Sequence, residues 1–389
     1  MLEPLRISPF KVSEESLMAE AEKQTGFSDW GDEEFRKGFR ILLKSLQTEA
    51  NLSLLGKLII KKNLARLLAN RLRIQNDFTQ HSEIRKESIN KPLFIIGLPR
   101  TGTTLLYNLL ARDPGARTPL LWELFQPSPP PEENTRESDP RIEMVRKRYQ
   151  QMDRLVPQMR AIHNMNPTEP EECVMLFQNI FASHIFSWAY DVPSYTRWIL
   201  QHDMVPAYRY YKSILQLLQW RTPGEHWSLK SPHHLFHLDA LLTVFPDACF
   251  IQTHRHPEKA VGSFCSLVTT MRRVNSKRAD QAYIGKTQLE GLATGTERGM
   301  DAREKANPAQ FYDLQYQDLI ADPKGQVRKI YNYFGYPINE KMEAGMENWL
   351  TNNRQHKHGK HTYTLEQFGL SSNAIERRFS RYMDAFGIE

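Results

Sequence analysis

Residues 93–104, which read LFIIGLPRTGTT, decide the fold. Their apolar start and first glycine are typical of a buried parallel strand, and residues 103–111 continue with a helical pattern. The two glycines keep the spacing of the nucleotide phosphate loop, G-x-x-x-x-G-K-[ST], but Thr103 stands at the lysine position. Such a loop presents backbone N–H groups to a phosphate, and Arg100 and Thr104 add donors. We therefore expect an anion-binding loop without the lysine that serves triphosphate chemistry.

Three later apolar runs repeat this arrangement, and each ends at a polar residue and is followed by a helix-like segment. Strands that alternate with helices predict an α/β fold, with a parallel β-sheet flanked by helices. In such sheets, ligands bind beyond the carboxyl ends of the strands, where these polar residues lie. The runs and their polar ends are 227–229 with Lys230, 249–253 with Arg255, and 311–316 with Gln317.

The remaining chain is predicted to be helical. Residues 1–90 form a helical N-terminal region that we expect to pack on the same domain, and residues 91–389 form the α/β domain. Between about 118 and 224 the strand pattern stops, and a helical, aromatic-rich insertion suggests a substrate pocket. Residues 60–73 form a basic amphipathic helix, which could lie on a membrane but more commonly packs on its own domain.

Composition excludes several classes of protein. The chain has 389 residues, 40% hydrophobic and 25% charged, which argues against collagen, low-complexity disorder and disulfide-stapled mini-proteins. A net charge of +6 does not by itself indicate nucleic acid, and we expect no nucleic-acid partner. Three cysteines without paired spacing are expected to be buried thiols. Residues 1–32 resemble no signal peptide, and no transmembrane segment is predicted, so we expect a cytoplasmic protein.

The loop of residues 99–104, PRTGTT, resembles the 5′-phosphosulfate loop of sulfotransferases that use 3′-phosphoadenosine 5′-phosphosulfate (PAPS). Cytosolic members have lysine at the position of Arg100, whereas tyrosyl-protein and many bacterial members have arginine. The resemblance extends over roughly residues 93–369 and is weak through the helical insertion. It implies PAPS as the co-substrate and assigns the phosphosulfate to Arg100, Thr101, Gly102, Thr103 and Thr104.

Three further segments resemble cofactor contacts of that family. Arg255, with Ser263 eight positions later, matches the pair that binds the 3′-phosphate. Tyr316 matches the tyrosine that contacts the adenine, although Gln317 replaces the usual glutamate. Residues 357–359 (Lys357 and Gly359 with a histidine between them) stand in place of the late Arg-Lys-Gly loop that closes over the 3′-phosphate. This last match is loose, and a solvated basic loop is the alternative.

Sulfonyl transfer needs cations at the bridging oxygen and a base for the acceptor proton. Arg100 and Lys230 are the predicted cations. For the base, we expect His233, three residues after Lys230 where cytosolic members have the histidine two residues on. Adjacent His234 is an alternative.

Two carboxylates compete with the histidines for the role of base. Tyrosyl-protein sulfotransferases use a glutamate shortly after the phosphate loop, and Glu123 lies in that region. Glu172 could enter the pocket from the helical insertion. The sequence leaves the choice open.

The sequence therefore predicts an enzyme that transfers the PAPS sulfonate to a hydroxyl of a small, hydrophobic acceptor. His234 and His237 could share a helix face, but a third ligand is missing, so we expect no metal. The alternatives are a divergent P-loop phosphotransferase, which Thr103 disfavours, or a non-catalytic protein that binds anionic surfaces through residues 60–73 or 272–278. The sequence does not predict the oligomeric state.

Overall fold

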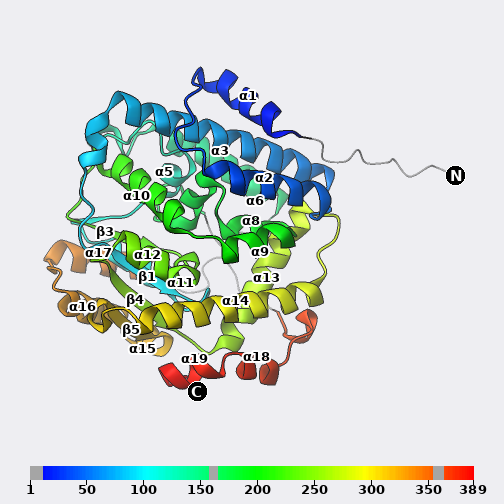
Figure 1. Ribbon diagram of the computed structural model, residues 1–389. Coiled ribbons are helices and arrows are strands. Elements are labelled where there is room, and N and C mark those ends of the chain that lie inside the picture. The colour runs from blue at the N-terminus through cyan, green and yellow to red at the C-terminus, as the bar shows by residue number, and fades with distance from the viewer. Residues whose placement is uncertain (1–11, 157–164, 354–362) are drawn as a thin grey trace.

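The computed structural model describes residues 12–156, 165–353 and 363–389 (Figure 1). Its centre is a five-stranded parallel sheet in the order β2-β3-β1-β4-β5. This confirms the predicted parallel α/β fold. The strands are β1 (Leu93–Gly97), β2 (Ala116–Arg117), β3 (His226–Lys230), β4 (Cys249–His254) and β5 (Phe311–Gln315).

Strand β1 lies in the middle of the sheet, as its apolar composition predicts. All five of its residues are buried, and it pairs with β3 on one side and β4 on the other. The register places Ile95 beside Lys230 and Gly97 beside Thr253. The carboxyl ends of three strands therefore meet at one edge of the sheet.

The two faces of β1 contribute to different cores, because successive side chains of a strand point to opposite sides. Leu93 and Ile95 pack with the helices α4 (Thr103–Leu110), α16 (Pro323–Phe334) and α17 (Glu340–Asn352). Phe94 and Ile96 belong to a larger core on the other face. That core also contains buried residues of the helices α11 (His233–Phe236), α12 (Leu238–Val244), α13 (Pro257–Asn275) and α14 (Gln281–Glu304).

The N-terminal helices belong to this larger core and cover one side of the molecule (Figure 1). They are α1 (Glu14–Thr25), α2 (Phe35–Thr48) and α3 (Leu54–Gln80). On α3, Asn70 donates a hydrogen bond to the Phe125 carbonyl (3.0 Å), which joins this region to the insertion. The division of the chain at residue 90 stays a prediction.

The insertion between β2 and β3 is helical in its described part. Its elements are α5 (Leu121–Phe125), η2 (Glu133–Thr135), α6 (Pro140–Leu155), η3 (Cys173–Ile180), α8 (His184–Ala189), α9 (Pro193–Gln201) and α10 (Val205–Gln219). Many of its aromatic side chains, including Phe177, Phe181 and Tyr208, are fully buried and pack on one another. These aromatic side chains therefore belong to the hydrophobic core, whether or not some of them also line a pocket.

The chain ends with short helices on the side of the sheet opposite the N-terminal helices (Figure 1). They are η5 (Glu366–Phe368), α18 (Ser372–Arg378) and α19 (Ser380–Phe386). The remaining described elements are α15 (Tyr316–Ala321), which follows β5, and the short 3-10 helices η1 (Ser82–Lys86) and η4 (Pro308–Gln310). The three cysteines are buried and unpaired. Within the described residues, we find no helix with the length and apolar character needed to cross a bilayer.

Candidate functional site

The carboxyl edge of the sheet brings together the predicted cationic residues. Lys230 is the last residue of β3, Arg100 lies in the loop after β1, and Arg255 follows β4 directly. Tyr316 follows β5. Because the strand order is β3-β1-β4-β5, these four side chains succeed one another across the sheet in that order. Parallel strands thus bring residues more than 150 positions apart, such as Arg100 and Arg255, into contact.

The loop between β1 and α4 has the backbone conformation that its glycines predict. Gly97 and Gly102 have positive φ angles of 137° and 87°. A Cβ at Gly97 would lie 2.6 Å from the Thr253 carbonyl oxygen, and one at Gly102 would lie 2.9 Å from Leu319. Arg100 also has a positive φ angle, 68°, which L-residues seldom adopt. The tight loop therefore depends on both glycines.

Thr101 braces this loop from within. Its hydroxyl donates to the Leu98 carbonyl (2.7 Å) and lies 2.6 Å from the Thr253 hydroxyl, and its side chain is fully buried. Only its backbone N–H is therefore a candidate for contact with an anion.

The start of α4 faces the space above the loop. The first helical hydrogen bond runs from the Leu106 N–H to the Gly102 carbonyl (3.2 Å). The N–H groups of residues 103–105 precede that bond, and such groups bind anions at helix N-termini. Thr104 is exposed there, whereas Thr103 is buried. The turn can thus hold a phosphate largely through its backbone.

Hydrogen bonds connect the phosphate loop with the two residues predicted to bind a second phosphate. The Arg100 Nε donates to the Ser263 hydroxyl (3.1 Å), and the Arg255 Nη1 donates to the Arg100 carbonyl (2.9 Å). The Arg255 guanidinium also lies 4.0 Å from the centroid of the Tyr316 ring. Four predicted cofactor residues therefore form one connected group. Lys357 and Gly359 lie outside the described residues.

Lys230 and Glu172 form a nearly buried ion pair at the same edge. The Lys230 Nζ lies 2.7 Å from a Glu172 carboxylate oxygen, and the side chains are 2% and 20% exposed. The lysine nitrogen also lies 5.7 Å from the Tyr107 ring centroid. The pKa of Arg100 is lowered, first by burial and also by the charge of Arg255, while the Glu172 carboxylate opposes that shift. Glu172 thus acts electrostatically on both predicted catalytic cations.

Glu123 has a different environment. Its fully buried carboxylate accepts two hydrogen bonds from Arg117 (2.8 and 3.0 Å), one from Arg136 (3.1 Å) and one from the Leu120 N–H (2.9 Å). Burial would raise the pKa of Glu123, but the charges of Arg117 and Arg136 and these hydrogen bonds lower it below its ordinary value. A carboxylate held by this many donors is a poor proton acceptor. Glu123 instead anchors the start of the insertion.

His233 and His234 lie in the aromatic core between β1 and the insertion, where His234 contacts the Phe94 ring and His233 contacts the Phe177 ring. Both are fully buried, and neither His233 ring nitrogen has a hydrogen-bond partner among the described residues. Burial lowers the pKa of His233 well below its ordinary value, and electrostatic repulsion from His237, His184 and His234 lowers it further. His234 contacts the Tyr208 hydroxyl through Nδ1 (3.0 Å), and burial lowers its pKa to about 3. Both rings are therefore neutral at pH 7 and resist protonation.

A third histidine, His184, joins His233 and His237 in a group that sequence spacing did not indicate. Ring nitrogens of these three residues lie within 4.8 Å of one another, and His184 and His237 approach to 3.0 Å. Burial and the charge of Arg298 both lower the pKa of His184 and His237. A nearby cation disfavours a bound metal ion, so we propose no metal role for this group.

Three comparisons with known proteins bear on this site. A sequence profile described as sulfotransferase family matches residues 92–340. The chain belongs to this family. The matched region contains every predicted site residue except Lys357 and Gly359, including the loop, Lys230 and Arg255.

Curated and solved relatives agree with the family assignment. The omega-hydroxy-beta-dihydromenaquinone-9 sulfotransferase Stf3 of Mycobacterium tuberculosis is 25% identical over 308 residues, 77% of this chain and 75% of the relative. The structure of sulfotransferase STF1 from the same species matches with a TM-score of 0.82 and 34% identity, covering 95% of this chain and 99% of that one. Sulfotransferase STF9 of Mycobacterium avium matches with a TM-score of 0.90 and 29% identity, covering 100% and 99%.

The protein is therefore a sulfotransferase enzyme with the sulfotransferase α/β fold. This confirms the family and the enzyme class that the phosphosulfate loop predicted. It removes the support for the two alternatives, a divergent phosphotransferase and a non-catalytic binding protein.

Proposed function

We propose that this sulfotransferase transfers the sulfonate of PAPS to a hydroxyl group of a hydrophobic, lipid-like acceptor. The observation that carries the proposal is the row of Lys230, Arg100, Arg255 and Tyr316 along the carboxyl edge of the sheet. Direct contacts join the last three of these residues. Such a row suits a ligand with two phosphate groups and an aromatic base.

The residues present fit the two ends of PAPS. The turn of residues 98–104 and the N–H groups at the start of α4 are suited to the 5′-phosphosulfate. Arg255 and Ser263 each lie one hydrogen bond from Arg100 and are suited to the 3′-phosphate. Tyr316 lies beneath the Arg255 guanidinium, where its ring can stack on the adenine. When bound, PAPS supplies an activated sulfonate group.

In the proposed reaction, the acceptor oxygen forms a bond to sulfur while the bond between sulfur and the bridging phosphate oxygen breaks. Negative charge collects on the bridging oxygen, and the cations of Arg100 and Lys230 stabilise it there. The proton of the acceptor hydroxyl passes to a base on the protein. The products are a sulfate ester and adenosine 3′,5′-bisphosphate.

We propose Glu172 as that base. It is the carboxylate in contact with Lys230, and it is partly exposed, so an acceptor hydroxyl can reach it. Glu123 has both oxygens occupied by Arg117, Arg136 and the Leu120 amide. The pKa of His233 is too low for efficient proton capture near neutral pH, because its surroundings are apolar. The resemblance favoured His233, whereas local geometry favours Glu172.

The acceptor class rests on two observations. The insertion that would face the acceptor is rich in apolar and aromatic residues. The relative Stf3 is named for an omega-hydroxylated dihydromenaquinone, which is a hydroxyl at the end of a long apolar chain. We therefore expect a terminal or side-chain hydroxyl on a long-chain lipid.

Transfer of radiolabel from PAPS to candidate acceptors tests the proposal. We expect transfer to an omega-hydroxylated prenyl quinone and not to a short water-soluble alcohol. Arg255→Ala should weaken adenosine 3′,5′-bisphosphate binding about 10- to 100-fold by calorimetry, because a charged hydrogen bond is lost. Adenosine 5′-monophosphate, which lacks the 3′-phosphate, serves as the matched control and should bind the variant almost as well as the parent. Equal losses for both nucleotides, or no binding of the bisphosphate, would contradict the proposal.

A further inference from the structure

The start of α3 exposes a compact group of leucines. Leu54, Leu55 and Leu58 are 63%, 42% and 61% exposed and lie on the first turns of the helix. The other large apolar side chains that are exposed in the described residues lie apart from one another in the sequence. Isolated apolar side chains are common on protein surfaces, but a contiguous group indicates an interaction site.

The backbone holds this turn firmly against the end of α13. The Ser53 N–H donates to the Asn275 carbonyl (3.0 Å), and the Lys277 N–H donates to the Asn51 carbonyl (3.0 Å). Gly56 packs so closely that a Cβ would lie 1.9 Å from the Asn275 carbonyl oxygen. The start of α3, at the right-hand side of Figure 1, is therefore a rigid support for the leucines.

Basic residues surround the leucines from both segments. Residues 51–62 contain three lysines and no acidic residue, and Lys61 and Lys62 are exposed. The end of α13 and the link that follows add the exposed residues Arg273, Lys277 and Arg278. We call Leu54, Leu55 and Leu58, together with these five exposed basic residues, the leucine–lysine patch.

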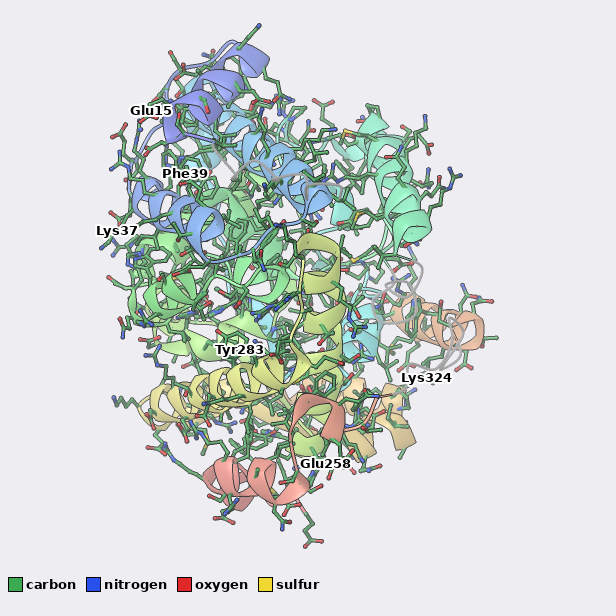
Figure 2. All side chains as sticks on the ribbon, turned by 90° about the vertical axis from the view of Figure 1, so that its right-hand side faces the viewer. Glu15, Lys37, Phe39, Glu258, Tyr283 and Lys324 are labelled. Atoms are coloured by element: carbon green, nitrogen blue, oxygen red, sulfur yellow. The ribbon has the colours of Figure 1, made fainter. Side chains whose placement is uncertain are left out.

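Acidic residues also lie near this surface, and most of them are engaged by groups other than the basic residues of the patch. Glu20 lies 3.6 Å from the Lys61 nitrogen, and Asp191 pairs with the buried Arg272 (3.2 Å). Asp280 caps α14 by accepting from the Tyr283 N–H (3.1 Å), and Glu49 accepts from the Ser194 N–H (3.1 Å), so both carboxylates keep their charge but contact none of the five basic side chains. Figure 2 looks onto this side of the molecule, with Tyr283 labelled near the start of α14. Four exposed basic residues of the patch thus have no acidic partner among the described residues.

We infer that the leucine–lysine patch docks the enzyme on an anionic lipid bilayer. Leucines flanked by basic residues match an interface in which apolar side chains enter the acyl boundary and cations meet the head groups. Nucleic acid would use the cations but leave the leucines in water. A protein partner would need a complementary acidic rim, and nothing on this surface favours that over lipid. The inference depends only on the patch and not on the identity of the acceptor.

Co-sedimentation with lipid vesicles tests this inference, using the full chain without cofactor or acceptor. The wild-type protein should bind phosphatidylcholine vesicles that contain phosphatidylglycerol, and added salt should weaken the binding. The variant Leu54→Ser/Leu55→Ser/Leu58→Ser should bind about tenfold more weakly or worse, because its apolar anchor is lost. The variant Lys277→Glu/Arg278→Glu should show a similar loss, because the head groups then meet like charge.

Two matched controls separate the patch from general effects. Met144→Ser removes an exposed apolar side chain from α6, and Lys329→Glu/Lys341→Glu makes the same charge change on α16 and α17. Both controls should bind vesicles like wild type, and all variants should keep the wild-type melting temperature because the changed side chains are exposed. The inference is overturned if wild type does not bind anionic vesicles or if either patch variant binds as well as wild type. It is equally overturned if the leucine variant only changes self-association in ultracentrifugation.

Discussion

At the scale of single residues, the surroundings of Glu172 and Glu123 carry the proposed assignment of the base. Both glutamates lie in the segment after β2, and the family resemblance points to Glu123 rather than to Glu172. In space, Glu172 meets Lys230, whereas Glu123 is enclosed by Arg117 and Arg136. The partners are up to 58 positions away in sequence, so only the fold shows which carboxylate contacts Lys230.

The first prediction concerns Glu172. Glu172→Gln keeps the shape of the side chain and can still hydrogen-bond Lys230, but it cannot accept a proton. We expect kcat to fall about 10²- to 10⁴-fold, the usual contribution of a general base. Affinity for adenosine 3′,5′-bisphosphate, measured by calorimetry, should remain and serves as the folding control. Full turnover in this variant would contradict the assignment of Glu172 as the base.

The second prediction concerns Glu123, whose substitution should affect stability rather than proton transfer. Glu123→Gln leaves the buried Arg117 without its charged partner, which should cost about 3–5 kcal/mol in the free energy of unfolding. Because the pKa of Glu123 is lowered in the folded state, its contribution is fully present above its unfolded pKa of 4.5. The contribution disappears as the pH falls through the lower, folded pKa. Urea unfolding at pH 7 and at pH 3 should therefore show a smaller difference between wild type and variant at pH 3.

At the scale of elements, the strands that carry the site were predictable and several other features were not. Apolar runs ending at polar residues identify β1, β3, β4 and β5, because a buried parallel strand must be apolar and its functional end is polar. Strand β2 has two residues, including Arg117, which is too short for any such pattern. The group of His184, His233 and His237 also stayed hidden, since α8 and α11 meet only after folding.

The third prediction concerns the packing of α14 against α11. A Cβ at Gly295 would lie 2.0 Å from the ring of Phe236, so Gly295→Ala should destabilise the protein by about 1–3 kcal/mol through overpacking. Gly291 lies one helical turn earlier, and a Cβ there meets nothing within 4 Å. Gly291→Ala should therefore stabilise the same helix by up to about 1 kcal/mol. Thermal melting of both variants checks this pair, and equal melting temperatures would contradict the packing described.

The buried position of α11 also affects the predicted active site. The helix follows Lys230 within three residues, so its position fixes the end of β3. We expect Gly295→Ala to lower turnover as well as stability, because a displaced α11 moves Lys230 relative to Arg100. Affinity for adenosine 3′,5′-bisphosphate should change less, since Arg255 and Tyr316 lie across the sheet.

At the scale of the whole molecule, one hydrophobic core joins the N-terminal helices, the insertion and one face of the sheet. The core runs from Leu17 through Phe94 to Tyr382. The sequence predicts that residues 1–90 pack on the α/β domain but gives no contact, because the helical pattern identifies a buried face and not its partner. The structure supplies contacts such as Asn70 with Phe125, and Ser53 with Asn275.

The fourth prediction follows from this shared core. The protein should unfold in a single cooperative transition by calorimetry, with equal calorimetric and van't Hoff enthalpies. A fragment of residues 91–389 would expose the apolar faces that α2 and α3 now cover, and it should lack a cooperative melting transition. It should also fail to bind adenosine 3′,5′-bisphosphate, although every predicted cofactor residue is present in it. A stable fragment that binds the bisphosphate would mean that the N-terminal helices form a separate unit. That result would leave the row of cations along the sheet intact, because β1, β3, β4 and β5 all lie beyond residue 91.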